Sequence, residues 1–448
     1  MSTIDEKHNA SVPAGRLARM ARLGSLATGV AGGMIAEGAR QLAQGNRPTV
    51  SDLLLTPANA KRVADELARL RGAAMKVGQL LSMDAGDMLP PELTEILSRL
   101  RSDAKPMPLS QLAKVLDENW GKGWNTHFQQ FSFQPLAAAS IGQVHSAQTK
   151  DGRHLVLKIQ YPGVRESIGS DVDNVTTLLR ISGLIPKGID YQHLLEEAKL
   201  QLHQEADYLQ EAAHMRHYQT LLADSPEFTI ATVHDDFTTV NILAMDYIGG
   251  VPIESLSSAP QEERDRVMTL LMSLLFREIF DFRLVQTDPN FANYRYDRAT
   301  QQLILLDFGA TRAYPASIAE GYHQVMQGAV QKDRAMMDAG ATQIGFFQEF
   351  IRPEQREAVL DLFVQACEPL RWDGVYDFGT SNLATRIRDA GMALSMEQDY
   401  WHTPPADALF LHRKLGGLYL LAAKLRARVD VGGLFNSTTT NCATLAAF

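Results

Sequence analysis

Three polar residues in the second half of the chain constrain its fold more than any other feature. Asp288 precedes Asn293 by five residues, and Asp307 follows Asn293 by fourteen. Apolar residues lead into Asp307, which opens the tripeptide Asp307-Phe308-Gly309. Carboxylate and amide oxygens are the hard ligands that Mg²⁺ prefers, so we predict Asp307 and Asn293 as ligands of a magnesium ion.

This spacing is that of the catalytic loop and the metal loop of protein kinases. Phosphoryl transfer needs Mg²⁺ to neutralise the triphosphate, and Asp288 stands where a carboxylate orients or deprotonates a hydroxyl group or a water molecule. A lone Asp-Phe-Gly often marks only a turn, whereas the two motifs together at this spacing are more specific. The sequence therefore predicts a site for ATP and Mg²⁺, with Asp288 as a catalytic residue.

An alanine-rich segment, residues 136–144, lies between two predicted strands. Aligned on its last residue, it matches a kinase glycine-rich loop in which Gly142 keeps the third glycine, while Ala137 and Ala139 replace the first two. Each added Cβ removes freedom at positive φ and narrows the space above the phosphates, so this loop should be stiffer than a glycine loop. The predicted nucleotide-binding residues of the loop are Ala137, Ala138, Ala139, Ser140, Gly142 and Val144.

Lys158 ends an apolar strand, and from this position a lysine reaches the α- and β-phosphates. Taken alone, the segment is better interpreted as an ordinary hairpin with a lysine at its edge, but the order of the downstream motifs favours nucleotide binding. A buried lysine needs an acidic partner, and the predicted helix over residues 196–214 carries Glu205, Asp207 and Glu211. Asp207 and Glu211 share a helix face, and Glu205 lies about 160° from Asp207, so one helix serves two partners only if it ends or kinks. The alternative is a solvated acidic face.

Met245 and Tyr247 end the last predicted strand of the sheet, before Gly249-Gly250. In a kinase fold, this is where the linker binds adenine through its backbone, and Met245 would border the adenine pocket. Many core strands look like this, so the prediction of these two nucleotide-binding residues rests on their position.

The composition excludes several classes of protein. With 43 Lys and Arg residues against 52 Asp and Glu residues, the formal charge is −9, so we expect no binding to nucleic acid. The two cysteines, Cys367 and Cys442, form no Cys-x-x-Cys pair. They therefore exclude a disulfide scaffold and a cysteine-based zinc site, and they fit a reducing compartment.

The best candidate for a membrane segment is residues 23–36, a Gly- and Ala-rich run of 14 residues. A span needs roughly 18 to 20 residues, so this run is too short to cross a bilayer. Three arginines precede it within residues 16–22, and Gly29 and Gly33 have the spacing that lets two helices approach closely. One hypothesis is a helix on an anionic membrane surface that pairs into a homodimer. The alternative is a flexible leader, because glycines destabilise helices.

Hydrophobic periodicity predicts the other elements. Helical patterns begin near Asn59 and at Pro90-Pro91. Further helices are expected over residues 109–119, 166–183 and 191–221, and strands over residues 131–138, 143–149, 154–160, 228–236 and 239–248, the last two joined at Asp235-Asp236. After Gly250 the chain is expected to be largely helical, apart from a short hairpin around Tyr294–Tyr296 and Leu303–Leu306.

Together these motifs resemble the UbiB family of atypical protein-kinase-like proteins, which serve coenzyme Q (ubiquinone) biosynthesis. The marker is Lys76-Val77-Gly78-Gln79, the family's Lys-x-Gly-Gln motif, and the resemblance covers roughly residues 11–435. The other matching motifs are Ala137-Ala138-Ala139-Ser140, Glu205-Ala206-Asp207, Asp288-Pro289-Asn290 and Asp307-Phe308-Gly309. The leader looks most like the branch of the mitochondrial members and their proteobacterial relatives.

The resemblance assigns regulatory roles to Lys76 and Gln79, on a helical extension that folds over the active site. It implies that Lys76 meets Glu205 and Asp207. It also implies that Lys158 pairs with Glu211, and both then join Asp288 as catalytic residues. Such an extension would occlude the place where a protein substrate normally lies, which suits ATP hydrolysis or phosphorylation of a small lipid-like molecule better.

The function implied is that of an atypical kinase-like ATPase that binds Mg-ATP and supports ubiquinone biosynthesis at a membrane surface. The implied partners are ATP, quinone precursors and quinone-biosynthesis enzymes. The implied location is cytoplasmic, peripheral on a bacterial inner membrane, or the mitochondrial equivalent. The rival hypotheses are a non-catalytic pseudokinase scaffold that uses ATP to switch shape, and a small-molecule or lipid kinase, for which the aminoglycoside type is the model.

Two departures from the kinase pattern stand out. Gln286 occupies the place where kinases usually carry His before the catalytic Asp, and Phe291-Ala292 replaces a common Pro-Gly. Neither departure removes a ligand, so we expect metal binding to survive.

The predicted fold class is α+β, a two-lobed protein-kinase-like fold with a helical N-terminal extension. The predicted divisions are residues 1–50 for the leader with its membrane-surface helix, 51–130 for the extension with the Lys-x-Gly-Gln motif, 131–248 for the kinase-like N-lobe and 249–448 for the helical C-lobe.

Overall fold

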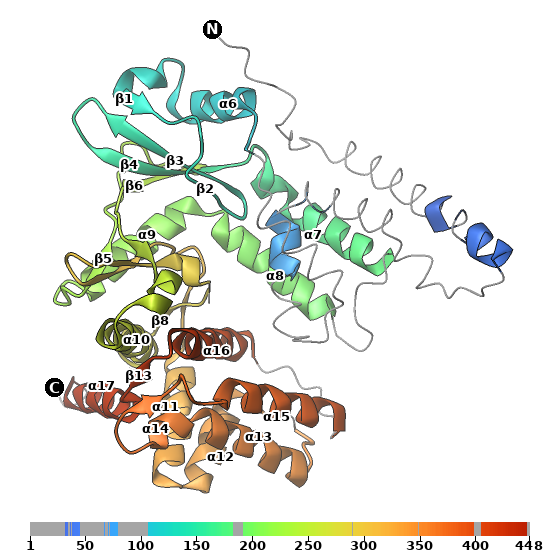
Figure 1. Cartoon of the computed structure of the whole chain (residues 1–448), viewed down its shortest axis with the longest axis vertical. Coiled ribbons are helices and arrows are strands. Elements are labelled where there is room, and N and C mark those ends of the chain that lie inside the picture. The colour runs from blue at the N-terminus through green and yellow to red at the C-terminus, as the bar shows by residue number, and fades with distance from the viewer. Residues whose placement is uncertain are drawn as a thin grey trace. The chain divides into compact units, whose positions relative to one another are not determined.

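Apolar alternation on both sides of an Asp-Gly turn produces the hairpin at the centre of the first half of the fold. β3 (Gly142–Thr149) and β4 (His154–Gln160) pair in antiparallel fashion, and Gly152 takes a φ of 95° in the turn between them. The sheet has the order β1-β3-β4-β6, in which β1 spans Phe128–Phe131 and β6 spans Ile242–Asp246 (Figure 1). The short strand β2 (Ala137–Ala138) also pairs with β3.

The computed structural model describes residues 32–34, 36, 38–44, 67, 70, 72–78, 106–181, 191–288, 290–347, 349–397 and 405–445. The chain divides into two units, of which the first contains residues 1–213 and 232–247, and the second contains residues 214–231 and 248–448. The predicted leader residue Gly29, the helix expected at Pro90-Pro91 and the regulatory residue Gln79 lie outside the described residues, whereas Gly33 is described and is helical.

Helices complete the first unit. They are α6 (Leu109–Trp120), the 3₁₀ turn η3 (Trp124–His127), α7 (Val164–Ile181), α8 (Tyr191–Glu205) and the beginning of α9 (Tyr208–Leu221). One hydrophobic cluster joins the sheet to α6 and includes Trp124 and Phe128. A second cluster joins α7 and α8 to the helical piece formed by residues 72–78.

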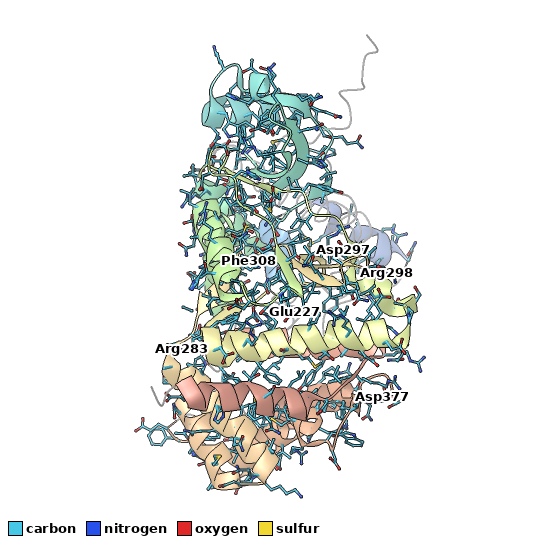
Figure 2. The ribbon with its side chains drawn as sticks, turned by 90° about the vertical axis from the view of Figure 1, so that its left-hand side faces the viewer. Glu227, Arg283, Asp297, Arg298, Phe308 and Asp377 are labelled. Carbon is cyan, nitrogen blue, oxygen red and sulfur yellow. The ribbon has the colours of Figure 1, made fainter. Side chains whose placement is uncertain are left out.

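The second unit contains a mixed sheet of order β5-β10-β9-β7 and many helices. Its strands are β5 (Phe228–Ile230), β7 (Val251–Pro252), β8 (Leu284–Gln286), β9 (Tyr294–Asp297), β10 (Gln302–Leu305), β11 (Thr311–Ala313), β12 (Tyr376–Asp377) and β13 (Arg428–Val429). Its helices are α10 (Gln261–Phe276), α11 (Ala316–Gln331), α12 (Arg334–Ile344), α13 (Pro353–Ala366), α14 (Glu368–Arg371), α15 (Leu383–Glu397), α16 (Ala406–Leu425) and α17 (Val431–Leu445). Shorter turns are η4 (Ile253–Ser258), the π-helical η5 (Arg277–Phe282) and η6 (Phe291–Asn293). α10 and α16 run side by side (Figure 2).

The α+β class predicted from the sequence is confirmed, with three corrections of detail. The strand expected over residues 131–138 is instead two short strands, β1 and β2, with no strand over residues 132–136. The strands expected over residues 228–236 and 239–248 do not form one continuous hairpin, because β5 pairs with β10 in the second unit while β6 pairs with β4 in the first. Only a short antiparallel bridge, Val233 to Met245, joins the two segments. The helix expected over residues 191–221 breaks into α8 and α9.

Candidate nucleotide and metal site

Lys158 lies inside the sheet of the first unit, opposite Val144 on β3 and Leu243 on β6. Its ammonium nitrogen is 2.6 Å from Oε1 of Glu211 on α9, and the two side chains are 13% and 2% exposed. An unpaired buried carboxylate would cost several kcal/mol in lost hydration, so the lysine is its necessary partner. The implied pair is therefore present, whereas its role in binding phosphate stays a prediction.

A break between α8 and α9 lies between Glu205 and Asp207, two acidic residues that one continuous helix would place on different faces. α8 ends at Glu205, and Asp207 caps α9, because its Oδ1 accepts a hydrogen bond from the backbone N–H of Gln210 at 3.1 Å. Within the break, the side-chain amide of Gln160 donates to the carbonyl oxygen of Ala206 at 2.8 Å. These two contacts stabilise the break between α8 and α9, which is the helix end or kink that the sequence predicted.

Glu205 pairs with the lysine of the Lys-x-Gly-Gln motif. Lys76 Nζ is 2.5 Å from Glu205 Oε1, and the side chains are 6% and 16% exposed. Asp207, the other implied partner of Lys76, lies 3.7 Å from the guanidinium group of Arg165 on α7. Lys76 and Lys158 therefore pair with two different glutamates, on different helices.

The alanine-rich loop is a tight hairpin. The backbone N–H of Ala139 donates to the carbonyl oxygen of Gly142 at 3.0 Å, which leaves Ser140 and Ile141 at the tip. None of the three alanines has a positive φ, so each position accepts a Cβ without backbone strain. Gly142 differs, because a Cβ there would lie 2.2 Å from the carbonyl oxygen of Ile159 on β4. This contact explains why the third glycine of the loop is kept.

The tip of this loop packs against the helical piece that carries Lys76. Ile141 is 3% exposed and belongs to the same hydrophobic cluster as Ala73. A Cβ on Gly72 would lie 2.7 Å from the carbonyl oxygen of Ser140, so the two backbones are already in close contact. The alanine-rich loop and the Lys-x-Gly-Gln helix are thus directly coupled.

Met245 and Tyr247 occupy different environments at the end of β6. Met245 is 4% exposed and pairs with Val156 on β4. Tyr247 is 46% exposed, and its ring stacks on His154 with a centroid distance of 4.4 Å. Their contact with adenine stays a prediction.

In the second unit, hydrogen bonds join the two loops of the catalytic and metal motifs. The side-chain amide of Asn293 donates to Oδ2 of Asp288 at 2.9 Å, and its backbone carbonyl accepts from the N–H of Leu306 at 3.0 Å. Both the backbone N–H and the hydroxyl of Thr287 donate to the carbonyl oxygen of Ala310, at 3.0 and 2.6 Å. The two loops are therefore held together on both sides of Asp288.

The metal loop is fixed by its own turn and by a buried ring. Asp307 Oδ1 accepts a hydrogen bond from the backbone N–H of Gly309 at 3.0 Å. Phe308, which is labelled in Figure 2, is 1% exposed. The centroid of its ring lies 4.8 Å from that of Tyr218 on α9. This packing holds the loop rigidly at the carboxylate.

The donor set fits a magnesium ion. The side-chain nitrogen of Asn293 donates to Asp288, which leaves its oxygen and the Asp307 carboxylate as the predicted ligand atoms of the two motifs. Among the residues that the structure describes, no group of three or more His, Cys, Asp or Glu side chains could hold a metal ion.

A second Asp-Phe-Gly, which the sequence analysis did not single out, shows what this tripeptide does alone. Asp377 Oδ1 accepts a hydrogen bond from the backbone N–H of Gly379 at 2.8 Å, as Asp307 does from Gly309. No Asp-x-x-x-x-Asn motif stands fourteen residues before it. The turn therefore comes from the tripeptide itself, and the metal assignment of Asp307 depends on the neighbouring catalytic loop.

Two residues that support the catalytic loop, Glu278 and Lys414, were not predicted from the sequence. Gln286 donates its backbone N–H to Glu278 Oε1 at 3.2 Å, and its side-chain oxygen accepts from the hydroxyl of Tyr294 at 3.4 Å. Glu278 and Lys414 are 1% and 3% exposed and form an ion pair. The one sequence feature that could have indicated this pair is the position of Lys414 within the apolar stretch of α16.

Comparison with known proteins decides the family. Residues 99–340, more than half of the chain, match the model of the ABC1 atypical kinase-like domain. The atypical kinase COQ8, mitochondrial, of Saccharomyces cerevisiae is 38% identical over 434 residues, which cover 96% of this chain and 86% of the yeast protein. The chain belongs to the UbiB family of atypical kinase-like proteins. As a UbiB protein, it is an enzyme of the atypical-kinase type with the kinase-like fold that the motifs predicted.

Other relatives of this UbiB chain agree. The atypical kinase COQ8B, mitochondrial, of Rattus norvegicus is 37% identical and covers 97% of this chain and 82% of the rat protein. Among solved structures, that of Rv3197 with erythromycin from Mycobacterium tuberculosis superposes with a TM-score of 0.57 at 26% identity, covering 82% of this chain and 92% of Rv3197. In the part of this UbiB chain that the structure describes, no helix is long and apolar enough to cross a bilayer.

Proposed function

We propose that this UbiB protein binds Mg-ATP and hydrolyses it in support of ubiquinone biosynthesis at a membrane surface. The observation that carries the proposal is the hydrogen-bonded pair Asp288–Asn293, whose loop is tied to the metal loop of Asp307. The chain therefore has the two carboxylates, Asp288 and Asp307, and the amide, Asn293, that a kinase-like phosphotransferase uses. Relatives named as mitochondrial COQ8 atypical kinases support the proposed pathway.

Each retained residue has a chemical role in this proposal. Lys158, held by Glu211, contacts the α- and β-phosphates, and the backbone of the alanine-rich loop covers them. Asp307 and Asn293 hold Mg²⁺, which when bound neutralises charge on the triphosphate. Asp288 orients the attacking water or hydroxyl group.

The acceptor in this proposal is water or a small lipid-like molecule. The Lys76–Glu205 pair is largely shielded from solvent, and the helix that carries Lys76 packs against the tip of the alanine-rich loop. A segment anchored so firmly at the loop tip favours a small acceptor over an extended peptide. Quinone precursors and the enzymes that process them are the proposed partners, on the cytoplasmic face of a bacterial inner membrane or its mitochondrial equivalent.

The test is phosphate release by the purified full-length protein, with and without liposomes that contain quinone precursors. We expect release that depends on MgATP and rises with the liposomes, and an Asp288→Asn variant that binds MgADP but releases little phosphate. Nucleotide binding without phosphate release under any condition would instead support the pseudokinase scaffold. Phosphate transfer to a lipid-soluble product in place of release would support the lipid kinase.

A further inference from the structure

A buried ion pair lies in the second unit, and neither of its residues belongs to a motif that the family resemblance uses. Lys414 on α16 contacts Glu278 in the π-helical turn η5, and the side chains are 3% and 1% exposed. Desolvating both charges costs about as much as their attraction returns, so such a pair is weak evidence of stabilisation. We therefore look for a role of this ion pair other than stabilising the fold.

The carboxylate of Glu278 joins three elements. Its Oε2 contacts Lys414, while its Oε1 accepts from the hydroxyl of Tyr218 on α9 at 2.8 Å and from the backbone N–H of Gln286 at 3.2 Å. Gln286 ends β8, two residues before the catalytic Asp288. The pair therefore fixes the backbone from which the catalytic loop departs.

The backbone around Glu278 is unusual. η5 is a π-helical turn that continues α10 and ends at Phe282, and the next residue, Arg283, has a φ of 48°. π-helical turns are rare and occur often at functional sites, because the extra residue redirects the side chains of one turn. Here the turn contains Glu278, whose carboxylate lies beneath β8.

The other end of the metal loop is also held by α16. Near the beginning of α16, Asp407 accepts a hydrogen bond from Arg312 on β11 at 3.3 Å, and its carbonyl oxygen accepts from the hydroxyl of Tyr314 at 2.8 Å. The guanidinium carbon of Arg312 lies 4.0 Å from the ring centroid of Phe410 on α16. β11 pairs with β8 and directly follows the Asp-Phe-Gly turn.

We propose that Lys414 is a positioning residue, which through Glu278 couples α16 to β8 and holds the catalytic loop in register with the metal loop. The inference rests on the proposed function, because the loop it positions is the one that carries Asp288. Burial lowers the pKa of Lys414, and the charges of Glu278 and Asp288 oppose this shift, so Asp288 acts electrostatically on the same buried cation. Lys414 does not contact substrate in this role.

The test compares ATP hydrolysis and MgADP binding in four full-length proteins: the parent, Lys414→Met, the double variant Lys414→Met with Glu278→Gln, and Lys424→Met. Lys424 is the matched control, because it lies on the same helix and pairs with Glu254 at 2.5 Å but is 50% exposed. In the double variant, neither charge is left unpaired, and the glutamine oxygen still accepts from Gln286. We therefore expect this variant to fold even where Lys414→Met alone does not.

We expect kcat to fall by about tenfold to a hundredfold in the Lys414 variants, because a small misplacement of reacting groups has effects of that size. The dissociation constant for MgADP should stay within about threefold, since neither residue contacts the nucleotide. The double variant should recover the melting temperature but not kcat, and Lys424→Met should match the parent in both.

Recovery of kcat together with the melting temperature in the double variant would show a purely structural pair and overturn the inference. Parental kcat in a folded Lys414→Met protein would do the same. If the parent itself releases no phosphate from MgATP, the proposed function fails and this inference fails with it. Normal hydrolysis by the parent with unchanged variants refutes the inference alone.

Discussion

Two aspartates of this chain make the same turn, and only one of them has the neighbours of a metal ligand. Asp307 and Asp377 each accept a hydrogen bond from the backbone N–H two residues later, at 3.0 and 2.8 Å. Asp307 follows the catalytic loop at the spacing of a kinase, whereas Asp377 lies on β12, far along the chain. The pair offers a matched test of the metal assignment at the scale of a single atom.

We predict that Asp307→Asn weakens MgADP binding by about tenfold or more, because an amide is a poorer ligand for a hard cation than a carboxylate is. Asp377→Asn changes the same atom in the same turn and should leave binding unaltered. Calorimetric titration with MgADP measures both variants. Equal affinities of the parent and Asp307→Asn would remove Asp307 from the metal site.

His145 is a second residue with a measurable signature. Its side chain is completely buried on β3, Nδ1 lies 2.9 Å from the carbonyl oxygen of Ser132, and the ring stacks on Phe131. Burial lowers the pKa of His145 below its ordinary value of 6.5, although the hydrogen bond with Ser132 acts the other way. The folded protein therefore binds this proton less readily than the unfolded chain does.

Because the folded-state pKa is lowered, His145 contributes no penalty above pH 6.5 and destabilises the fold progressively as the pH falls below that value. We expect the free energy of unfolding of the parent to decrease between pH 7 and pH 5. His145→Gln should flatten this dependence, since its amide still donates to Ser132 but does not titrate. Urea-induced unfolding at several pH values measures the slope, with His217→Gln, an exposed position on α9, as the control. A His145→Gln slope identical to the parent's would contradict the assignment.

At the scale of elements, the close contact between the helical piece 72–78 and the alanine-rich loop depends on a missing side chain. A Cβ on Gly72 would lie 2.7 Å from the backbone oxygen of Ser140, a contact that neither backbone can relieve without moving. Gly169 on α7 has nothing within 4 Å of an added Cβ. The two helical glycines therefore predict opposite outcomes for the same substitution.

We expect Gly72→Ala to lower the free energy of unfolding by roughly 1–2 kcal/mol, as overpacking of a close contact outweighs the gain in helix propensity. It should also change nucleotide affinity, because the loop tip must move. Gly169→Ala should raise the free energy of unfolding by about 0.4–1 kcal/mol through its effect on the unfolded chain. Urea unfolding and MgADP titration of both variants measure these changes. A higher free energy of unfolding in Gly72→Ala would show that a Cβ fits between Gly72 and Ser140, and would contradict the prediction.

The elements that local sequence patterns specify were predicted well, and those set by distant contacts were not. β4 has the bounds expected from its apolar residues, because strand length and turn chemistry are local. The break between α8 and α9 depends on Asp207 and on Gln160 from β4, and the division of residues 228–248 between two sheets depends on β10. Such pairings are invisible to a periodicity argument.

The candidate site shows the same division. Asp288, Asn293 and Asp307 could be predicted as candidate site residues because the chemistry fixes their spacing along the chain. Glu278 and Lys414 are 136 residues apart in sequence, and nothing in either local pattern points to the other. The supports of a site are therefore harder to predict than the groups that bind the ligand.

At the scale of the whole molecule, the question is what brings the enzyme to its proposed membrane substrate. The described helices include none that could span a bilayer, and the candidate segment is the leader, of which the structure describes only residues 32–34, 36 and 38–44, nearly all of them helical. Its sequence places arginines before a Gly- and Ala-rich run, with Gly29 and Gly33 at the spacing of close helix pairs. Small apolar residues bury little area, so one copy alone should bind weakly.

We predict that membrane binding and dimerisation are coupled through this leader, because two paired copies present twice the apolar area and charge to the bilayer. The measurement is flotation with anionic liposomes of the full chain and of a truncated chain beginning at Pro48, at low and high salt. The full chain should float at low salt and less at high salt, since the arginines supply part of the attraction. Replacing both Gly29 and Gly33 with Leu adds apolar area but blocks close pairing, so it should reduce flotation if pairing is required and increase it if area alone matters. Equal flotation of the full and truncated chains would move the membrane contact out of the leader and into the kinase-like body.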